Sequence, residues 1–234
     1  MPITPTVFTL TVSELHPDGT GMRAQFSSKR AFARELEEPL RVRDGVILEE
    51  ENLQIRVAFL EHSIPCLAYA FAEKQHVNFM KNRLSELGAP VGPWLSELKC
   101  AVLRGEPDST VIVARSEREG ESGRAFTLGE LKDQVLEIVP GEKVAYVTDV
   151  AFTAGNRERI VELVRGADYL FIEAVFLHTD HERARDRAHL TARQAGEIAR
   201  EAQVARVIPF HFSPRHLGAE EELRQELAAA FLGK

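Results

Sequence analysis

The sequence has few cysteines and no long hydrophobic run. Its 234 residues include only Cys66 and Cys100, too few for a disulfide framework and without the C-x-x-C spacing of a cysteine zinc site. No apolar run approaches the roughly 20 residues that cross a bilayer, and the first residues lack both a basic start and a long apolar stretch. These absences favour a cytoplasmic protein with free thiols that does not enter a membrane.

An excess of positive charge is also missing. The 29 Lys and Arg residues against 36 Asp and Glu residues give a net charge of −7. This balance argues against a protein that binds polyanions over its whole surface, although it leaves room for a local basic patch. With 44% hydrophobic and 28% charged residues, the composition is typical of a globular protein with one large core or two small ones.

The first half of the chain changes from strand patterns to helix patterns. Period-two alternation in VFTLTV and short apolar stretches in GVILEE and QIRVAFLE predict a β meander. NFMKNRLSELGAP and PWLSELKCAVLRGEP then have apolar residues at helical spacing, which predicts two short helices joined by Gly92-Pro93. The polar stretch between Arg104 and Gly141 is expected to be an exposed excursion from the core.

From Lys143 onward, apolar runs alternate with amphipathic segments. The order βαβαβα predicts an α/β layer whose strands are covered by helices, with sites at the strand ends. The segments, in order, are VAYVTD, NRERIVELVRGA, YLFIEAVF, HLTARQAGEIAREAQ, VARVIPFHF and AEEELRQELAAAF.

Polar residues stand at the ends of these runs. Asp149, Glu173 and His211 end apolar runs, His62 ends RVAFLEH, and His189 begins a helix. Taken singly, Asp149 could be a turn or cap residue, and either of the two strand-end histidines could be an ordinary core histidine. Glu173 lies in an apolar strand and needs a partner. Together, imidazoles and a carboxylate are ligands that zinc and related divalent ions take.

These segments resemble ribonuclease Z, the metallo-β-lactamase-fold endonuclease that trims tRNA 3′ ends. The resemblance rests on KVAYVTDVAF, YLFIEAVF and RAHLTARQAGEIAREAQVARVIPFHFSPRH, with LEHSIPCLAYAF upstream. It implies an α/β fold of the αββα sandwich type, of which this chain covers mainly the second αβ half. Residues 1–234 would form a single partial domain, with residues 76–105 as a protruding helical arm inserted in it.

The resemblance also implies roles for single residues. His62, Asp149 and His211 match metal ligands, with Asp149 bridging two divalent ions, zinc or else manganese. His189 matches the proton donor to the leaving group, and Glu173 matches the glutamate that orients it. Gly92 and Pro93 match the root of the arm that grips tRNA, so a tRNA precursor is the expected partner.

The sequence departs from the family pattern in several places. The family's Gly-Asp-Thr is here Thr148-Asp149-Val150, and the histidine before the glutamate is Ile172. No His-x-His-x-Asp-His run occurs, and the nearest imitation, 178–181, lacks the first histidine and fits a solvated link better than a displaced metal site. We therefore expect a partial chain whose missing half carries that signature.

Three functions follow as hypotheses. The first is a ribonuclease Z-like, metal-dependent phosphodiester hydrolase that is incomplete without an N-terminal half. The second is a metallo-β-lactamase-fold hydrolase of a small phosphodiester or another ester, which the altered flanks of Asp149 and the acidic net charge keep open. The third is a non-catalytic interaction protein. In each case we expect a homodimer or a partner that supplies the missing half.

Overall fold

The computed structural model describes residues 7–115 and 123–234. Two compact units divide the chain: the first comprises residues 1–48, 55–70 and 144–234, and the second comprises residues 49–54 and 71–143. None of the helices in the described residues is long and apolar enough to span a membrane.

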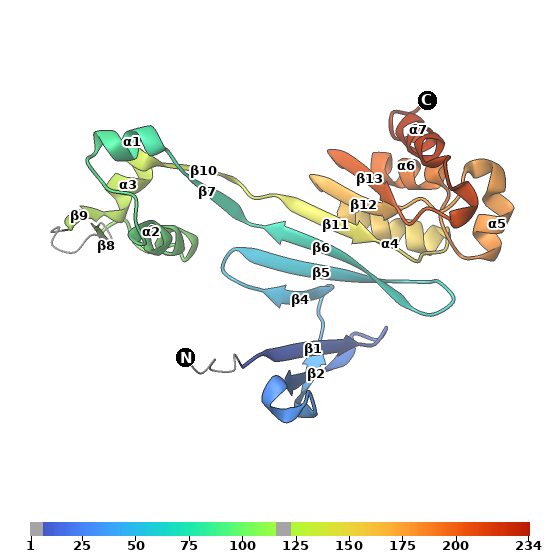
Figure 1. The fold of residues 1–234 in the computed structure, drawn as a ribbon, viewed down its shortest axis with the longest axis horizontal. Helices are drawn as coiled ribbons and strands as arrows, with labels where there is room; N and C mark the ends of the chain where they lie inside the picture. The colour runs from blue at the N-terminus through green and yellow to red at the C-terminus, as the bar shows by residue number, and fades with distance from the viewer. Residues whose placement is uncertain (1–6, 116–122) are drawn as a thin grey trace, which may run out of the picture. The chain divides into compact units, whose positions relative to one another are not determined.

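The first unit is built on most of a six-stranded sheet (Figure 1). The strand order is β13 (Arg206–Phe210), β12 (Tyr169–Glu173), β11 (Lys143–Val147), β6 (Cys66–Glu73), β5 (Leu53–Leu60) and β4 (Val46–Glu49). β11, β12 and β13 are parallel neighbours. Their carboxyl ends therefore meet at one edge of the sheet, which is where ligands bind in sheets of this kind.

Helices cover one face of these parallel strands. The buried strand residues Ala145, Val147, Leu170 and Ile172 belong to the same hydrophobic core as side chains from three helices. These helices are α4 (Ala154–Val164), α6 (Ala192–Glu201) and α7 (Glu220–Phe231). The βαβαβα order and the α/β class predicted from the sequence are confirmed, with one additional short helix, α5 (His181–Asp186), before α6.

The N-terminal part of the first unit is a small antiparallel sheet. It contains β1 (Thr9–Leu15), β2 (Thr20–Ser27) and β3 (Arg34–Arg41), which pair in sequence order. Gly19 has a φ of 78° in the turn between β1 and β2, a conformation that glycine adopts without steric cost. Of the three strands predicted for the first part of the chain, VFTLTV overlaps β1 of this sheet, whereas GVILEE and QIRVAFLE form β4 and β5 of the six-stranded sheet.

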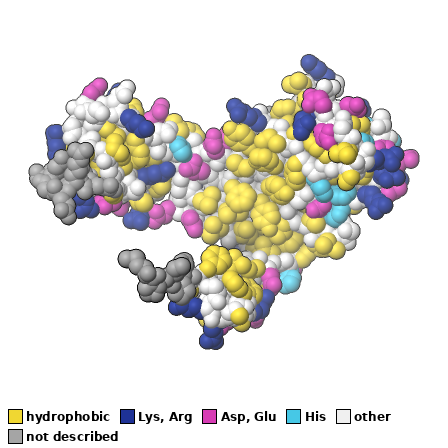
Figure 2. Space-filling model, viewed as in Figure 1, with side chains coloured by type: hydrophobic (Ala, Val, Ile, Leu, Met, Phe, Trp, Pro, Cys, Tyr) yellow, Lys and Arg dark blue, Asp and Glu magenta, His cyan; other side chains and the backbone are white. Residues whose placement is uncertain are grey.

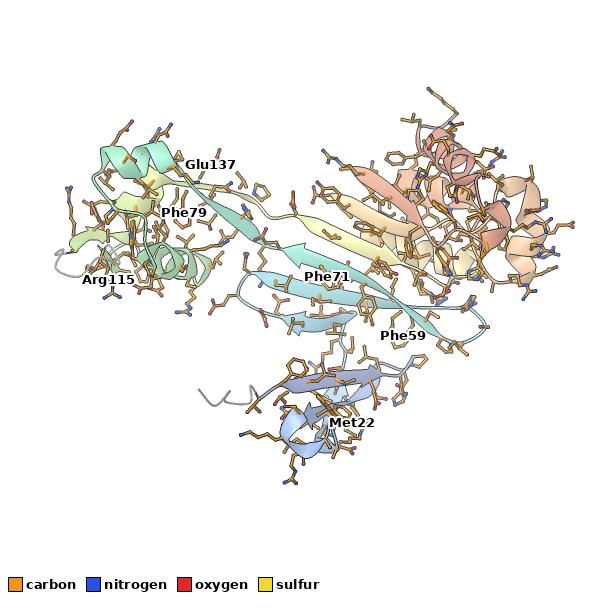
Figure 3. The ribbon with its side chains drawn as sticks, viewed as in Figure 1. Met22, Phe59, Phe71, Phe79, Arg115 and Glu137 are labelled. Carbon is orange, nitrogen blue, oxygen red and sulfur yellow. The ribbon has the colours of Figure 1, made fainter. Side chains whose placement is uncertain are left out.

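The second unit has its own core. β7 (Gln75–Phe79) pairs with β10 (Leu136–Pro140), on which Figure 3 labels Phe79 and Glu137. Trp94, Leu98 and Leu131 are fully buried in its core. The two predicted short helices are confirmed as α1 (Lys81–Glu86) and α2 (Trp94–Leu103). The predicted arm, 76–105, lies within this unit, and its role stays a prediction.

The prediction of an exposed excursion between Arg104 and Gly141 is wrong for most of that stretch. Residues 116–122 lie outside the described residues. The remainder forms β8 (Val111–Ala114), β9 (Arg124–Thr127) and α3 (Leu128–Val135), which add Ile112, Phe126 and Leu128 to the core of the second unit. The polar composition was misleading because β8 buries only alternate residues, β9 buries only Phe126, and α3 begins with a polar capping box, Thr127 with Glu130.

Candidate metal centre

The strand ends of the first unit bring the predicted site residues together. Glu173 is the last residue of β12, His211 directly follows β13, and Asp149 follows β11 by two residues. Glu173 is fully buried, whereas the side chains of Asp149 and His211 each keep 41% of their surface exposed. The site therefore has a buried carboxylate beneath two side chains that face solvent.

The backbone turns sharply at two of these positions. Asp149 has a φ of 51° and His211 a φ of 60°, both in the left-handed region. For a residue other than glycine this conformation costs about 1–2 kcal/mol, although Asp and His tolerate it better than most. The surrounding contacts must offset that cost, and such strain is common where a chain places functional side chains.

Glu173 is surrounded by hydrogen-bond donors. Its Oε1 accepts from the Leu190 backbone N–H at 2.9 Å and lies 3.2 Å from His189 Nδ1. Its Oε2 accepts from the Asp149 backbone N–H at 2.6 Å and lies 3.3 Å from His211 Nδ1. Burial by itself raises the pKa of Glu173, but the hydrogen bonds from His189, His211 and Leu190 outweigh it and lower the pKa to about 2. The carboxylate is therefore ionised at neutral pH, and the same hydrogen bond raises the pKa of His211.

His62 and His189 lie side by side at the edge of this cluster. Their ring centroids are 4.9 Å apart, and the His189 ring is also 5.3 Å from the His211 ring. His62 Nδ1 donates to the carbonyl oxygen of Ala188, at 2.8 Å, because a carbonyl can only accept. That bond leaves the Nε2 lone pair of His62 free to bind a metal ion.

The donor atoms at this edge fit a divalent metal ion. One ligand atom from each of Asp149, Glu173, His189 and His211 lies within 4.8 Å of the other three. Ligands on a zinc-like ion stand at about 2.0–2.2 Å from it, so donors on opposite sides are roughly 4 Å apart. Glu173 already accepts four hydrogen bonds, which leaves the partly exposed Asp149 and His211 as the more accessible ligands. The individual roles predicted for these residues remain predictions.

The imitation of the signature at 178–181 lies in another environment. His178 Nδ1 lies 3.2 Å from Thr191 Oγ1, and its backbone N–H donates to Glu226. Asp180 is paired with Arg215 and His216 at 3.5 and 3.4 Å. Among the described residues, the one candidate metal group contains neither His178 nor His181. These contacts favour the linker interpretation.

Gly92 and Pro93 lie in the second unit, directly before α2. A Cβ on Gly92 would stand 2.6 Å from the carbonyl oxygen of Arg115, so only glycine fits this close backbone approach. Local packing explains Gly92, and the substrate-binding role of this pair stays a prediction.

Two features of the site were not apparent from the sequence. Asn156, which is 1% exposed, bonds the backbone of Glu61 and of Ala151 and so joins the segments of His62 and Asp149. A hollow of about 300 Å³ beside His189 and His211 is lined by Arg183 of α5, by Arg187 directly after that helix and by two phenylalanines. In the sequence Asn156 stands between Gly155 and Arg157, so nothing there marks it as buried.

The sequence comparisons agree with the resemblance. A family model described as beta-lactamase superfamily domain matches residues 119–212. Ribonuclease Z of Brevibacillus brevis is 33% identical over 195 residues, which cover 82% of this chain and 55% of that protein. Ribonuclease Z of Thermobifida fusca is 35% identical over 199 residues, which cover 84% and 55%. The chain is ribonuclease Z-like.

This ribonuclease Z-like chain spans about half the length of the curated relatives it matches. Among solved structures, human tRNase Z, short form, superposes with a TM-score of 0.42 at 16% identity, covering 74% of this chain and 41% of that chain.

Proposed function

We propose that this chain provides the general acid and several metal ligands of a metal-dependent phosphodiester hydrolase that processes tRNA 3′ ends. One observation carries the proposal: a single buried carboxylate, Glu173, contacts Asp149, His189 and His211 at the carboxyl edge of a parallel sheet. Both curated relatives described above are named ribonuclease Z, which supports the choice of reaction and substrate.

His62, Asp149 and His211 would hold two divalent ions, zinc or else manganese. Three ligands are few for two ions, so this chain by itself should bind metal weakly. When bound, such ions lower the pKa of a coordinated water and neutralise charge on the phosphate. The chain's part is to orient the ligand nitrogens, and the Ala188 carbonyl and Glu173 do so for His62 and His211.

His189 would act as the general acid. Its Nδ1 lies 3.2 Å from the Glu173 carboxylate, which orients the ring. The other ring nitrogen would donate its proton to the departing ribose oxygen. The His189 side chain is 17% exposed, which shields it from most of the solvent while leaving it within reach of a substrate.

The partner would be a tRNA precursor in the cytoplasm, held in part by the arm, 76–105, with Gly92 and Pro93 at its root. Within that arm, Lys81 and Arg83 are exposed on α1 and line a surface hollow. Arg104 is ion-paired with Glu51, so it contributes less free positive charge. We also propose that the working form contains a second polypeptide, either another copy or one that supplies the signature histidines.

The test is cleavage of a precursor tRNA with a 3′ trailer, in zinc or manganese. The chain is assayed alone and mixed with the first half of Brevibacillus brevis ribonuclease Z. We expect no cleavage by the chain alone, cleavage at the 3′ end by the mixture, and none with Asp149→Asn. Hydrolysis of bis(p-nitrophenyl) phosphate without tRNA cleavage would support a small-ester hydrolase instead. A mixture that forms a complex and cleaves neither substrate would refute the proposal.

A further inference from the structure

Glu173 contacts more of the site than a glutamate that orients one histidine would need to contact. In the parallel register, Glu173 of β12 lies opposite Phe210 of β13, directly before His211. On the other side, Ile172 lies opposite Val147 of β11, two residues before Asp149. The carboxylate therefore stands between two chain segments that each supply a candidate metal ligand.

The two carboxylate oxygens have different backbone partners. Oε1 accepts from the backbone N–H of Leu190, while Oε2 accepts from the backbone N–H of Asp149 and faces His211 Nδ1. His189 Nδ1 lies between them, at 3.2 Å from Oε1 and 3.3 Å from Oε2. A carboxylate has about four acceptor positions, and all four are used here. Every partner donates a hydrogen bond, so the site is complementary to an ionised Glu173 carboxylate, which only accepts hydrogen bonds.

From this arrangement we infer that Glu173 is the positioning residue for the metal-ligand side of the site, Asp149 and His211, and not only for His189. This inference rests on the proposed function, because Asp149 and His211 are proposed there as metal ligands. Two structural effects follow from the contacts.

The first effect concerns the tautomer of His211. A carboxylate can only accept, so neutral His211 must carry its proton on Nδ1 and leave the Nε2 lone pair free. The His189 ring is fixed in the same way. Histidines that bind metals commonly donate their other N–H to a carboxylate, and losing that partner typically costs about 10–100-fold in metal affinity.

The second effect concerns the backbone at Asp149. Its left-handed φ of 51° directs the N–H toward Glu173 Oε2, at 2.6 Å. This charge-assisted bond offsets the cost of the left-handed turn and so holds the Asp149 side chain, whose Oδ1 lies 3.8 Å from His211 Nδ1.

Glu173→Gln tests this role at nearly constant shape. An amide has one accepting and one donating end, so one of its two sides would place an N–H against donors. The experiment records ring ¹⁵N–¹H spectra of the histidines, and hydrogen exchange of backbone amides, on metal-free 1–234 at a pH where the rings are neutral. His189→Ala is the matched control, because it removes a ring that contacts both oxygens, at 3.2 and 3.3 Å, and leaves the Asp149 and His211 contacts of Oε2 in place.

In the unmodified chain and in His189→Ala, we expect His211 to be protonated on Nδ1 and the Asp149 amide to be protected. In Glu173→Gln, we expect His211 to shift toward the Nε2-protonated form and the Asp149 amide to exchange at least tenfold faster, with β12 amides unchanged. Nε2 protonation of His211 in the unmodified chain overturns the inference even if the variant fails to fold, as does an unprotected Asp149 amide in the unmodified chain.

Neither readout requires RNA or metal. A chain with these ring states that supports no tRNA cleavage refutes the proposed function and leaves the positioning role intact. Cleavage of tRNA by a chain whose His211 carries its proton on Nε2 would refute the positioning role and leave the proposed function intact.

Discussion

Glu173 shows how a strand can end in a buried charge. Removing an ion from water costs several kcal/mol, and only close partners offset that cost. The sequence indicates that an acid between Ile172 and Ala174 needs a partner, and the structure provides donors from three separate segments. Removal of this residue would therefore disturb more than one side chain of the site.

His189→Ala separates the roles of acid and ligand. We expect the tRNA-cleaving mixture to lose turnover by about a hundredfold or more, because general acid catalysis contributes on that order. Metal content, measured by elemental analysis, should not change, because His189 faces Glu173 through Nδ1 and is not among the predicted ligands. Loss of metal in this variant would make His189 a ligand.

Asn156→Ala tests the hydrogen bonds by which Asn156 joins the segments of His62 and Asp149. The side chain accepts from the Glu61 N–H at 2.9 Å and donates to the carbonyls of Glu61 and Ala151 at 2.9 and 2.8 Å. Leaving these part-buried backbone groups unpaired should lower the free energy of unfolding by about 1–3 kcal/mol. Urea denaturation measures the change. Asn82 is exposed, so the free energy of unfolding of Asn82→Ala should stay within about 0.5 kcal/mol of that of the unmodified chain. Equal effects of the two substitutions would show that the Asn156 hydrogen bonds do not stabilise the fold.

At the scale of elements, α6 and α7 pack closely at one glycine. A Cβ on Gly196 of α6 would stand 2.4 Å from the Leu227 carbonyl oxygen and 2.8 Å from the Ala230 Cβ, both on α7. Glycine inside a helix is otherwise unfavourable by about 1 kcal/mol relative to alanine. Close packing between α6 and α7 therefore explains why position 196 is a glycine.

Two glycine substitutions test that packing. Gly196→Ala should destabilise the chain by about 1–3 kcal/mol, as overpacking does, despite its better helix propensity. Gly155→Ala in α4 is the matched control, because its Cβ would meet only the far end of the Arg159 side chain, at 3.2 Å, and no backbone. This control should be neutral or stabilising by up to about 1 kcal/mol. Thermal denaturation of both variants measures the difference, and a stabilised Gly196→Ala would contradict the close packing.

The elements that periodicity predicts well are those with a single continuous buried face. In β11, Ala145 and Val147 are buried whereas Tyr146 is exposed, and the pattern is visible in KVAYV. Periodicity does not predict β8 and β9, because each has only four residues and is surrounded by polar residues. For such short segments, tertiary packing decides the conformation and composition says little.

The candidate site was predictable as a set of residues but not as a geometry. Strand ends and histidine positions indicated Asp149, Glu173 and His211. The left-handed turns at Asp149 and His211 could not be predicted, because no glycine marks them. Nor could the division of Glu173 contacts between its two oxygens, which depends on the register of three strands.

At the scale of the whole chain, the two larger hydrophobic cores of the described residues do not share a residue. One includes Ile172 and Ile198 of the first unit, and the other includes Trp94 and Leu131 of the second. All five residues that the resemblance assigns to the metal centre lie in the first unit. The chemistry of that centre can therefore be examined through substitutions that leave the second core intact.

The face of the parallel sheet opposite the helices carries apolar side chains that could mediate self-association. Tyr146, Phe171 and Ile208 lie in register across β11, β12 and β13, on the face opposite to the helix-covered residues. Tyr146 is 40% exposed and stacks on Phe210 at 4.9 Å between ring centroids. Figure 2 shows hydrophobic side chains gathered over the strands of this unit. Large exposed apolar patches are uncommon on soluble monomers, so we expect the purified chain to self-associate through this face.

Tyr146→Glu should weaken that association, because burying a carboxylate in an apolar contact is unfavourable. Val111→Glu is the control: Val111 is 63% exposed but lies on β8 in the second unit, so its substitution should leave association unchanged. Light scattering and sedimentation velocity across a concentration series measure both variants. A monodisperse monomer at all concentrations, or equal effects of the two substitutions, would show that the sheet face does not mediate association.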